Sequence, residues 1–100
     1  MTKFTWIKGD VPENIKVKQI YGICFTKDGR TLLRIENGKY CLTGGKKDES
    51  DSNINETLKR EYIEEANTII EDPIMVGYQL VDEEDGTPLY AQIRMTALIK

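Results

Sequence analysis

The sequence contains no histidine among its 100 residues and only two cysteines, Cys24 and Cys41. These cysteines lie in separate apolar runs without the C-x-x-C spacing of a zinc site, and no imidazole is present to complete a mixed nitrogen and sulfur site. We therefore expect two reduced thiols buried in strands. Acid–base or metal chemistry must then come from carboxylates, lysines, tyrosines or the thiols.

Long hydrophobic runs are also missing. No apolar stretch approaches the roughly 20 residues of a membrane-spanning helix, and the N-terminal MTKFTWIKGD lacks the apolar segment of a signal peptide. We therefore expect a cytoplasmic protein with no membrane partner. Because the formal net charge is −3, the cationic excess that general binding to nucleic acids requires is absent as well.

The composition is that of one folded domain over residues 1–100. Hydrophobic residues make up 39% and charged residues 31% of the chain, as in ordinary globular proteins. After an arm or short edge strand over residues 1–16, a run rich in β-branched and aromatic residues predicts a strand at 17–26 and a hairpin to a second strand at 31–36. A third strand is expected at 39–43, where Gly44-Gly45 ends the pattern.

A helix is expected from Asn53 to about Ala66. Asn53 is a good N-cap, Glu56 can complete a capping box, and Asn67 tolerates the left-handed conformation that ends a helix. One strand or two follow over 69–81, and a last strand begins at Leu89.

In the last strand Ala91, Ile93, Met95, Ala97 and Ile99 share one face, and the alternation still continues at Lys100. Three interpretations stay open: an unusually short protein, a fragment of a longer one, or a sheet face that a second subunit of a homodimer covers.

Carboxylates are concentrated in one part of the chain. Residues 48–65 hold seven of the seventeen acidic residues, namely Asp48, Glu49, Asp51, Glu56, Glu61, Glu64 and Glu65. On a helical wheel Glu61 and Glu65 fall among the apolar positions Ile54, Leu58 and Tyr62 that must face the sheet, and Glu64 flanks them.

Ionised carboxylates on a buried helix face are costly unless a positive charge meets them. The wheel places Lys59 and Arg60 too far away for this, whereas a divalent cation with oxygen ligands fits.

The segment 44–68 resembles the Nudix box, G-x5-E-x7-R-E-U-x-E-E-x-G-U with U apolar. Arg60-Glu61-Tyr62-Ile63-Glu64-Glu65 matches its REUxEE part completely. One extra residue between Gly45 and Arg60 leaves the loop glutamate represented by Asp51, counted from the glycine, or by Ser52, counted from the arginine. Asn67 replaces the late glycine, Thr68 takes the apolar place after it, and Thr43 stands where many members have proline.

The resemblance implies an α/β fold of the α+β kind, an α/β/α sandwich with a mixed sheet, here without a C-terminal helix. It implies hydrolysis of a nucleoside diphosphate linked to another group, with Mg²⁺ or Mn²⁺ as cofactor. By position, Glu61, Glu64 and Glu65 would hold metal with the main-chain carbonyl of Gly44. Glu61 and Glu64 are thus the candidate catalytic carboxylates, and Arg60 would orient them.

The expected substrate is a small molecule derived from a nucleotide, whose identity the sequence leaves open. Candidate contacts to it are Arg34, Tyr40, Gly45, Lys46 and Asp51. The alternative function is a nucleotide-binding or regulatory module that has kept the fold and lost the chemistry, because the loop glutamate is changed and the chain ends early.

Overall fold

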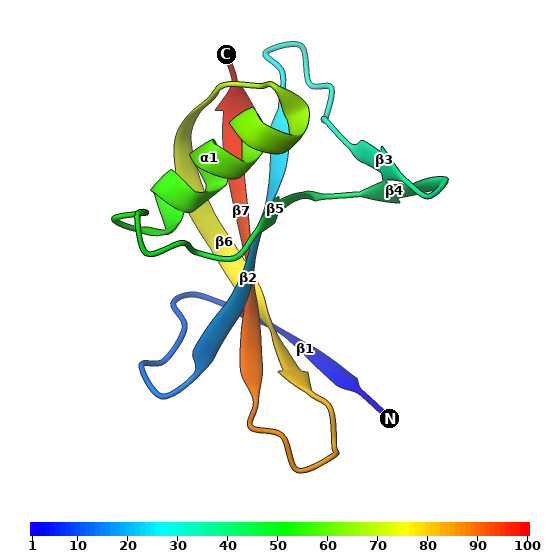
Figure 1. Ribbon diagram of the computed structural model, residues 1–100, viewed down its shortest axis with the longest axis vertical. Coiled ribbons are helices and arrows are strands. Elements are labelled where there is room, and N and C mark those ends of the chain that lie inside the picture. Colours follow the sequence, from blue (N-terminus) through cyan, green and yellow to red (C-terminus); the bar gives the residue numbers. More distant parts are fainter.

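The computed structural model describes all residues 1–100, which form seven strands and one helix (Figure 1). In chain order these are β1 (Lys3–Lys8), β2 (Lys16–Phe25), β3 (Arg34–Glu36), β4 (Lys39–Cys41), β5 (Thr43–Gly45), α1 (Ile54–Ala66), β6 (Ile70–Asp82) and β7 (Tyr90–Ile99).

Five strands make one mixed sheet in the order β1-β6-β7-β2-β5. Strands β2 and β7 run parallel, and the other neighbouring pairs are antiparallel. Strands β3 and β4 form a separate hairpin, which projects to the right in Figure 1. The predicted mixed sheet with a helix is therefore confirmed, as is the short edge strand near the N-terminus.

Helix α1 packs on one face of the sheet, and the core lies between them. The buried core residues are Ile20, Cys24, Leu58, Tyr62, Ile70, Tyr78, Ala91, Ile93, Met95 and Ala97. Four of them come from the buried face predicted for β7, and its fifth member, Ile99, packs against them while partly exposed. The alternation seen in the sequence therefore predicts which face of β7 is buried, because successive side chains point to opposite faces of a sheet.

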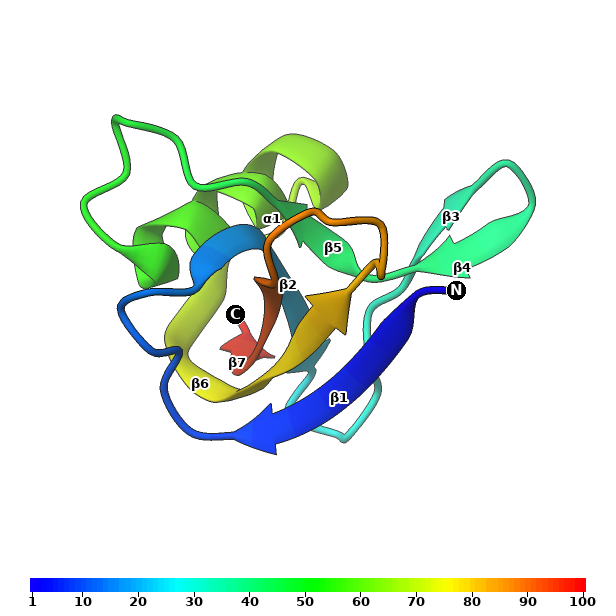
Figure 2. The ribbon, with the colours of Figure 1, turned by 90° about the horizontal axis from the view of Figure 1, so that it is seen from below.

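The opposite face of the sheet carries no helix, so two of the three layers of the expected sandwich are present (Figure 2). Phe25, Ile74 and Leu98 are exposed there and line a shallow apolar hollow. That a second subunit covers this face stays a prediction. No helix of the structure is long and apolar enough to cross a membrane.

The expected hairpin between residues 17–26 and 31–36 is wrong. Strand β2 meets the following segment only at its end, through the bridge between Phe25 and Thr31 and the hydrogen bonds from Leu32 and Thr31 to the Cys24 carbonyl. Along the rest of β2, β7 occupies one edge and β5 pairs with the other at 20–22. The chain therefore leaves the sheet after Thr31, and β3 pairs with β4 instead.

Gly44-Gly45 does not lie beyond the strand, as expected, but forms the last two residues of β5, so that prediction is also wrong. Gly44 lies opposite Tyr21 and Gly45 opposite Ile20. A Cβ atom on Gly44 would lie 2.1 Å from the carbonyl oxygen of Ile20. The missing side chain is thus what lets this strand lie so close to β2.

The helix ends agree with the sequence. The Asn53 side chain accepts a hydrogen bond from the Glu56 amide at 3.0 Å, although the Glu56 side chain does not return the second bond of a capping box. Asn67 ends the helix in the left-handed conformation, with φ 48°. Both cysteines are free thiols, but only Cys24 is buried, so the prediction of burial is wrong for Cys41.

Candidate active site

Glu61 lies on the inner face of α1 together with Leu58 and Tyr62, and all three residues are buried. Glu61 is 9% exposed. Its carboxylate lies under β5, where a Cβ atom on Gly45 would come within 2.8 Å of Glu61 Cδ. A side chain on Gly45 would therefore occupy the space that the Glu61 carboxylate fills.

Glu61 and Glu65 lie one helical turn apart with their carboxyl groups within hydrogen-bonding range. Burial raises the pKa of Glu61 above its ordinary value, and Glu65 raises it further, while Arg60 acts in the opposite direction. Glu61 is buried and the Glu65 side chain is 28% exposed, and two neighbouring carboxylates cannot both ionise without cost when one of them is buried. Glu61 pairs with Arg60 and Glu65 with Arg34, but these two arginines also pair with Asp51, Glu64 and Glu36, so carboxylates outnumber guanidinium groups around the pair.

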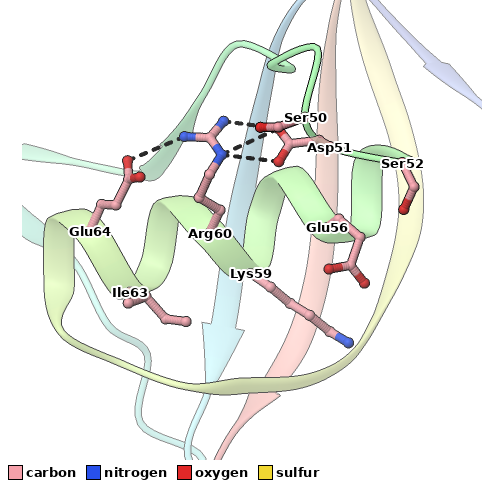
Figure 3. A pocket seen from close by; sticks show the side chains of 8 residues that line it. All are labelled: Ser50, Asp51, Ser52, Glu56, Lys59, Arg60, Ile63 and Glu64. Carbon is pink, nitrogen blue, oxygen red and sulfur yellow. Dashed lines mark hydrogen bonds and ion pairs between the residues drawn. The ribbon is translucent and has the colours of Figure 1, made fainter.

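Arg60 is the centre of a hydrogen-bonding network that joins Glu61 to Asp51 and Glu64, and Figure 3 shows its bonds to the last two. Its guanidinium donates to Asp51 Oδ2 at 3.0 Å, to Glu61 Oε1 at 2.9 Å and to Glu64 Oε2 at 3.2 Å. It also donates to the carbonyl oxygen of Lys46 at 3.1 Å. The expectation that Arg60 lies too far from the carboxylates is wrong, because its long side chain bends along the helix to positions that a wheel of Cα directions does not show.

Asp51 fixes the loop before α1 to the helix. It is buried, and its carboxylate accepts from Arg60, from the Thr57 hydroxyl and from the Asp48 amide. The Arg60 bonds are the largest cause that holds the pKa of Asp51 at about 2, below its ordinary 3.8. Of the two residues that could replace the loop glutamate, Asp51 is the one that reaches the motif, while Ser52 is exposed.

Glu64 points outward and is 59% exposed. No group of three acidic side chains converges on one point in the structure. The residues nevertheless fit a hard divalent cation, since Glu61 and Glu65 offer two adjacent carboxylates and such ions complete their shell with water and phosphate oxygens. The buried Glu61, which shares its arginine partner Arg60 with Asp51 and Glu64, is the observation that supports this fit.

Arg34 links the acids to a hollow of about 290 Å³ between the sheet and the β3–β4 hairpin. Its Nε lies 3.2 Å from Glu65 Oε2 but makes no aligned hydrogen bond, so this buried atom has no acceptor. Tyr21 and Arg94 line the same hollow, with the guanidinium 5.2 Å from the ring centroid. Neither residue belongs to a motif, so only their aromatic and cationic character could have indicated them in the sequence.

The other predicted contacts lie in different places. Lys46 follows Gly45 on the loop beside Arg60. Tyr40 is 75% exposed on β4 and lines no hollow. The largest hollow, about 430 Å³, lies on the outer side of α1 among Asp51, Lys59 and Arg60, and neither Glu61 nor Glu65 lines it (Figure 3). We therefore place the candidate site on the inner side of the helix.

Comparison with solved structures finds a similar fold in the crystal structure of a mutant of the Bacillus subtilis pyrophosphohydrolase BsRppH, a Nudix protein. The TM-score is 0.80 at 20% sequence identity, over 99% of this chain and 61% of that one. The chain has a Nudix-like fold. It spans about 61% of the length of that structure's chain. Comparison with protein-family models finds no match, and comparison with curated proteins finds none either.

In the Nudix-like fold the segment 44–68 runs from β5 through the loop and α1 to the helix end. Asn67 adopts the left-handed conformation that a glycine would supply in the box. The structure thus brings Gly44, Gly45, Glu61 and Glu65 together and ties Asp51 and Glu64 to them through Arg60. Their roles in binding and catalysis stay predictions.

The two adjacent glycines predict different effects of adding one methyl group. Gly44→Ala would press on backbone atoms of β2 and should lower the free energy of unfolding by roughly 1–3 kcal/mol. The added methyl group of Gly45→Ala would meet only the end of the Glu61 side chain, which can shift more easily than backbone atoms. This substitution should therefore lower the free energy of unfolding less. Urea denaturation of both variants measures this, and an equal or larger loss for Gly45→Ala would contradict the geometry.

The low pKa of Asp51 predicts how stability depends on pH. Because the folded-state pKa is about 2 rather than 3.8, the carboxylate adds stability above its ordinary pKa and loses it as pH falls through this window. The stability advantage of the wild type over Asp51→Asn should therefore be present at about pH 6 and shrink toward about pH 2. Glu49→Gln in the same loop is the control, and urea denaturation at several pH values is the measurement. A difference that does not change with pH would show that the ion pair is not its source.

Proposed function

We propose that the protein is a hydrolase that cleaves the pyrophosphate linkage of a nucleoside diphosphate joined to another group, with Mg²⁺ or Mn²⁺. The observation that carries this proposal is the buried Glu61 carboxylate, placed next to Glu65 under Gly45, whose one arginine partner, Arg60, is shared with Asp51 and Glu64. The similarity to the fold of a pyrophosphohydrolase supports the same reaction class.

Glu61 and Glu65 would hold the cation, with Glu64 and the Gly44 carbonyl as further oxygen ligands. When bound, such an ion neutralises the phosphates and lowers the pKa of bound water. Arg60 acts as a positioning residue, because its bonds to Asp51 keep its guanidinium where it fixes Glu61 and Glu64. In this assignment Arg60 holds the carboxylates in place and does not contact the substrate.

The reaction needs one proton acceptor. We assign this role to Glu64, since it is the most exposed of the three helix carboxylates and can reach water. The water oxygen forms a bond to phosphorus while its proton passes to Glu64 and the bridging P–O bond breaks. The bond's electrons leave with the departing phosphate group, so no redox partner is involved.

The nucleoside part would occupy the hollow beside Glu65. Tyr21 offers an aromatic face and Arg34 and Arg94 offer guanidinium groups, of which Arg94 has no carboxylate partner. Aromatic faces and arginines bind bases and phosphates. On the other side, Lys46 stands beside Arg60 and would meet the phosphates.

A second function, nucleotide binding without hydrolysis, is favoured by one observation. Glu64 is bonded to Arg60, and three carboxylates do not converge. If Glu64 keeps this position when ligands bind, the site has two carboxylates for a cation and no acid beside them to accept a proton.

Substitution of the helix carboxylates distinguishes the two functions. Glu64→Gln and Glu65→Gln should each lower Mg²⁺-dependent phosphate release from a panel of nucleoside diphosphate derivatives by at least about a hundredfold, because a proton acceptor or ligand is lost. Thermal unfolding should change little, and Glu56→Gln on the exposed first turn of α1 should keep full turnover.

Unchanged turnover in both variants would reject the hydrolase. A wild-type protein that is stabilised by nucleotide derivatives and Mg²⁺ but hydrolyses none of the panel would favour the binding module.

A further inference from the structure

Four lysines surround a hollow of about 270 Å³, and the function described so far uses only one of them, Lys46. Lys16 and Lys18 come from the beginning of β2, and Lys46 and Lys47 follow β5; with Val17 they line the hollow. Strands β2 and β5 are antiparallel with Ile20 opposite Gly45, so the segment entering one strand runs beside the segment leaving the other. The two segments lie on the same side of the molecule in Figures 1 and 2.

None of these four lysines forms an ion pair, although the chain carries a net charge of −3 and has seventeen acidic residues. Lys18 Nζ lies 4.1 Å from the centroid of the Tyr90 ring, and Asp85 attracts it without forming an ion pair. Like charges held together without counterions repel one another, so the cluster gains most from an anion that several ammonium groups contact at once.

The lysine hollow begins one residue beyond the glycine that covers Glu61. Lys46 accepts a hydrogen bond from Arg60 through its carbonyl, and Gly45 lies against the Glu61 carboxylate. An anion in the hollow would therefore adjoin the phosphates at the acidic site. It would not overlap the hollow of Tyr21 and Arg94, whose lining residues are all different.

We propose that the hollow lined by Lys16, Lys18, Lys46 and Lys47 binds the far end of a phosphate chain, and that the substrates are nucleotides with three or more consecutive phosphates. This inference rests on the proposed function for the reacting phosphates. A linkage of two phosphates would reach Lys46 at most and would leave Lys16, Lys18 and Lys47 without an anion. A longer chain places one part at the acids and the rest among the lysines.

Calorimetric titration with inorganic tripolyphosphate, in EDTA and at low salt, tests the site without metal or turnover. Lys16→Gln/Lys47→Gln removes one lysine from each segment and should weaken binding at least about tenfold, because charge-assisted hydrogen bonds are lost. Lys27→Gln/Lys39→Gln removes the same charge from a turn and from β4 and should bind as the wild type does. Inorganic orthophosphate should bind more weakly than tripolyphosphate.

Absence of tripolyphosphate binding by the wild type, or equal weakening in both double variants, would overturn the proposal. Glu64→Gln separates it from the proposed function, since this variant should bind tripolyphosphate normally even if it hydrolyses nothing. If instead Lys16→Gln/Lys47→Gln hydrolyses and binds chains of three phosphates as the wild type does, the lysine site is wrong and the hydrolase stands.

Discussion

The site depends on the ion pairs of one guanidinium group. Arg60 bonds to Asp51 in the loop, to Glu61 on the inner side of α1 and to Glu64 on its outer side. Removing Arg60 would leave a buried Asp51 without its partner and release the loop from the helix, which is costlier than losing an exposed salt bridge. Fold and site are therefore joined at this residue.

The second constraint is the approach of β5 to its neighbours. A strand that ends in two glycines can lie against the backbone of β2 and above Glu61 at once. Lys46 and Lys47 directly follow β5, so the position of this strand also places them in the lining of the lysine hollow. Short as it is, β5 thus connects the acids, which would hold a cation, with the lysines, which would hold an anion. Opposite charges arranged side by side suit a ligand that carries metal and phosphate together.

Much of this arrangement could be predicted from the sequence, because it depends on local patterns. The alternation in β7 and the caps of α1 at Asn53 and Asn67 follow from periodicity and backbone preference. The inward direction of Glu61 follows from its place beside Ile54 on the helical wheel, on the same face as Leu58. The pairing of β2 with β7 across most of the chain has no such local signal, and the expected hairpin failed for that reason.

Side-chain reach was the other source of error. A wheel gives the direction of each Cα–Cβ bond, but arginine extends several bonds further and bends, so Arg60 meets acids on both sides of its own position. The hollow of Tyr21 and Arg94 and the lysine hollow join residues distant in sequence, and only the sheet order brings them together. Motif positions such as Glu61 and Asp51 could be found from their spacing in the sequence. The neighbouring groups that shift the pKa values of these two carboxylates could not.

The central claim is that Glu61 and Glu65 share one divalent cation on the inner side of α1. Anomalous diffraction from crystals soaked in Mn²⁺ tests it directly. The account predicts a manganese peak between the two carboxylates, with Arg60 still bonded to Asp51. A map with no peak there, in which Glu61 remains bonded to Arg60 alone, would contradict it.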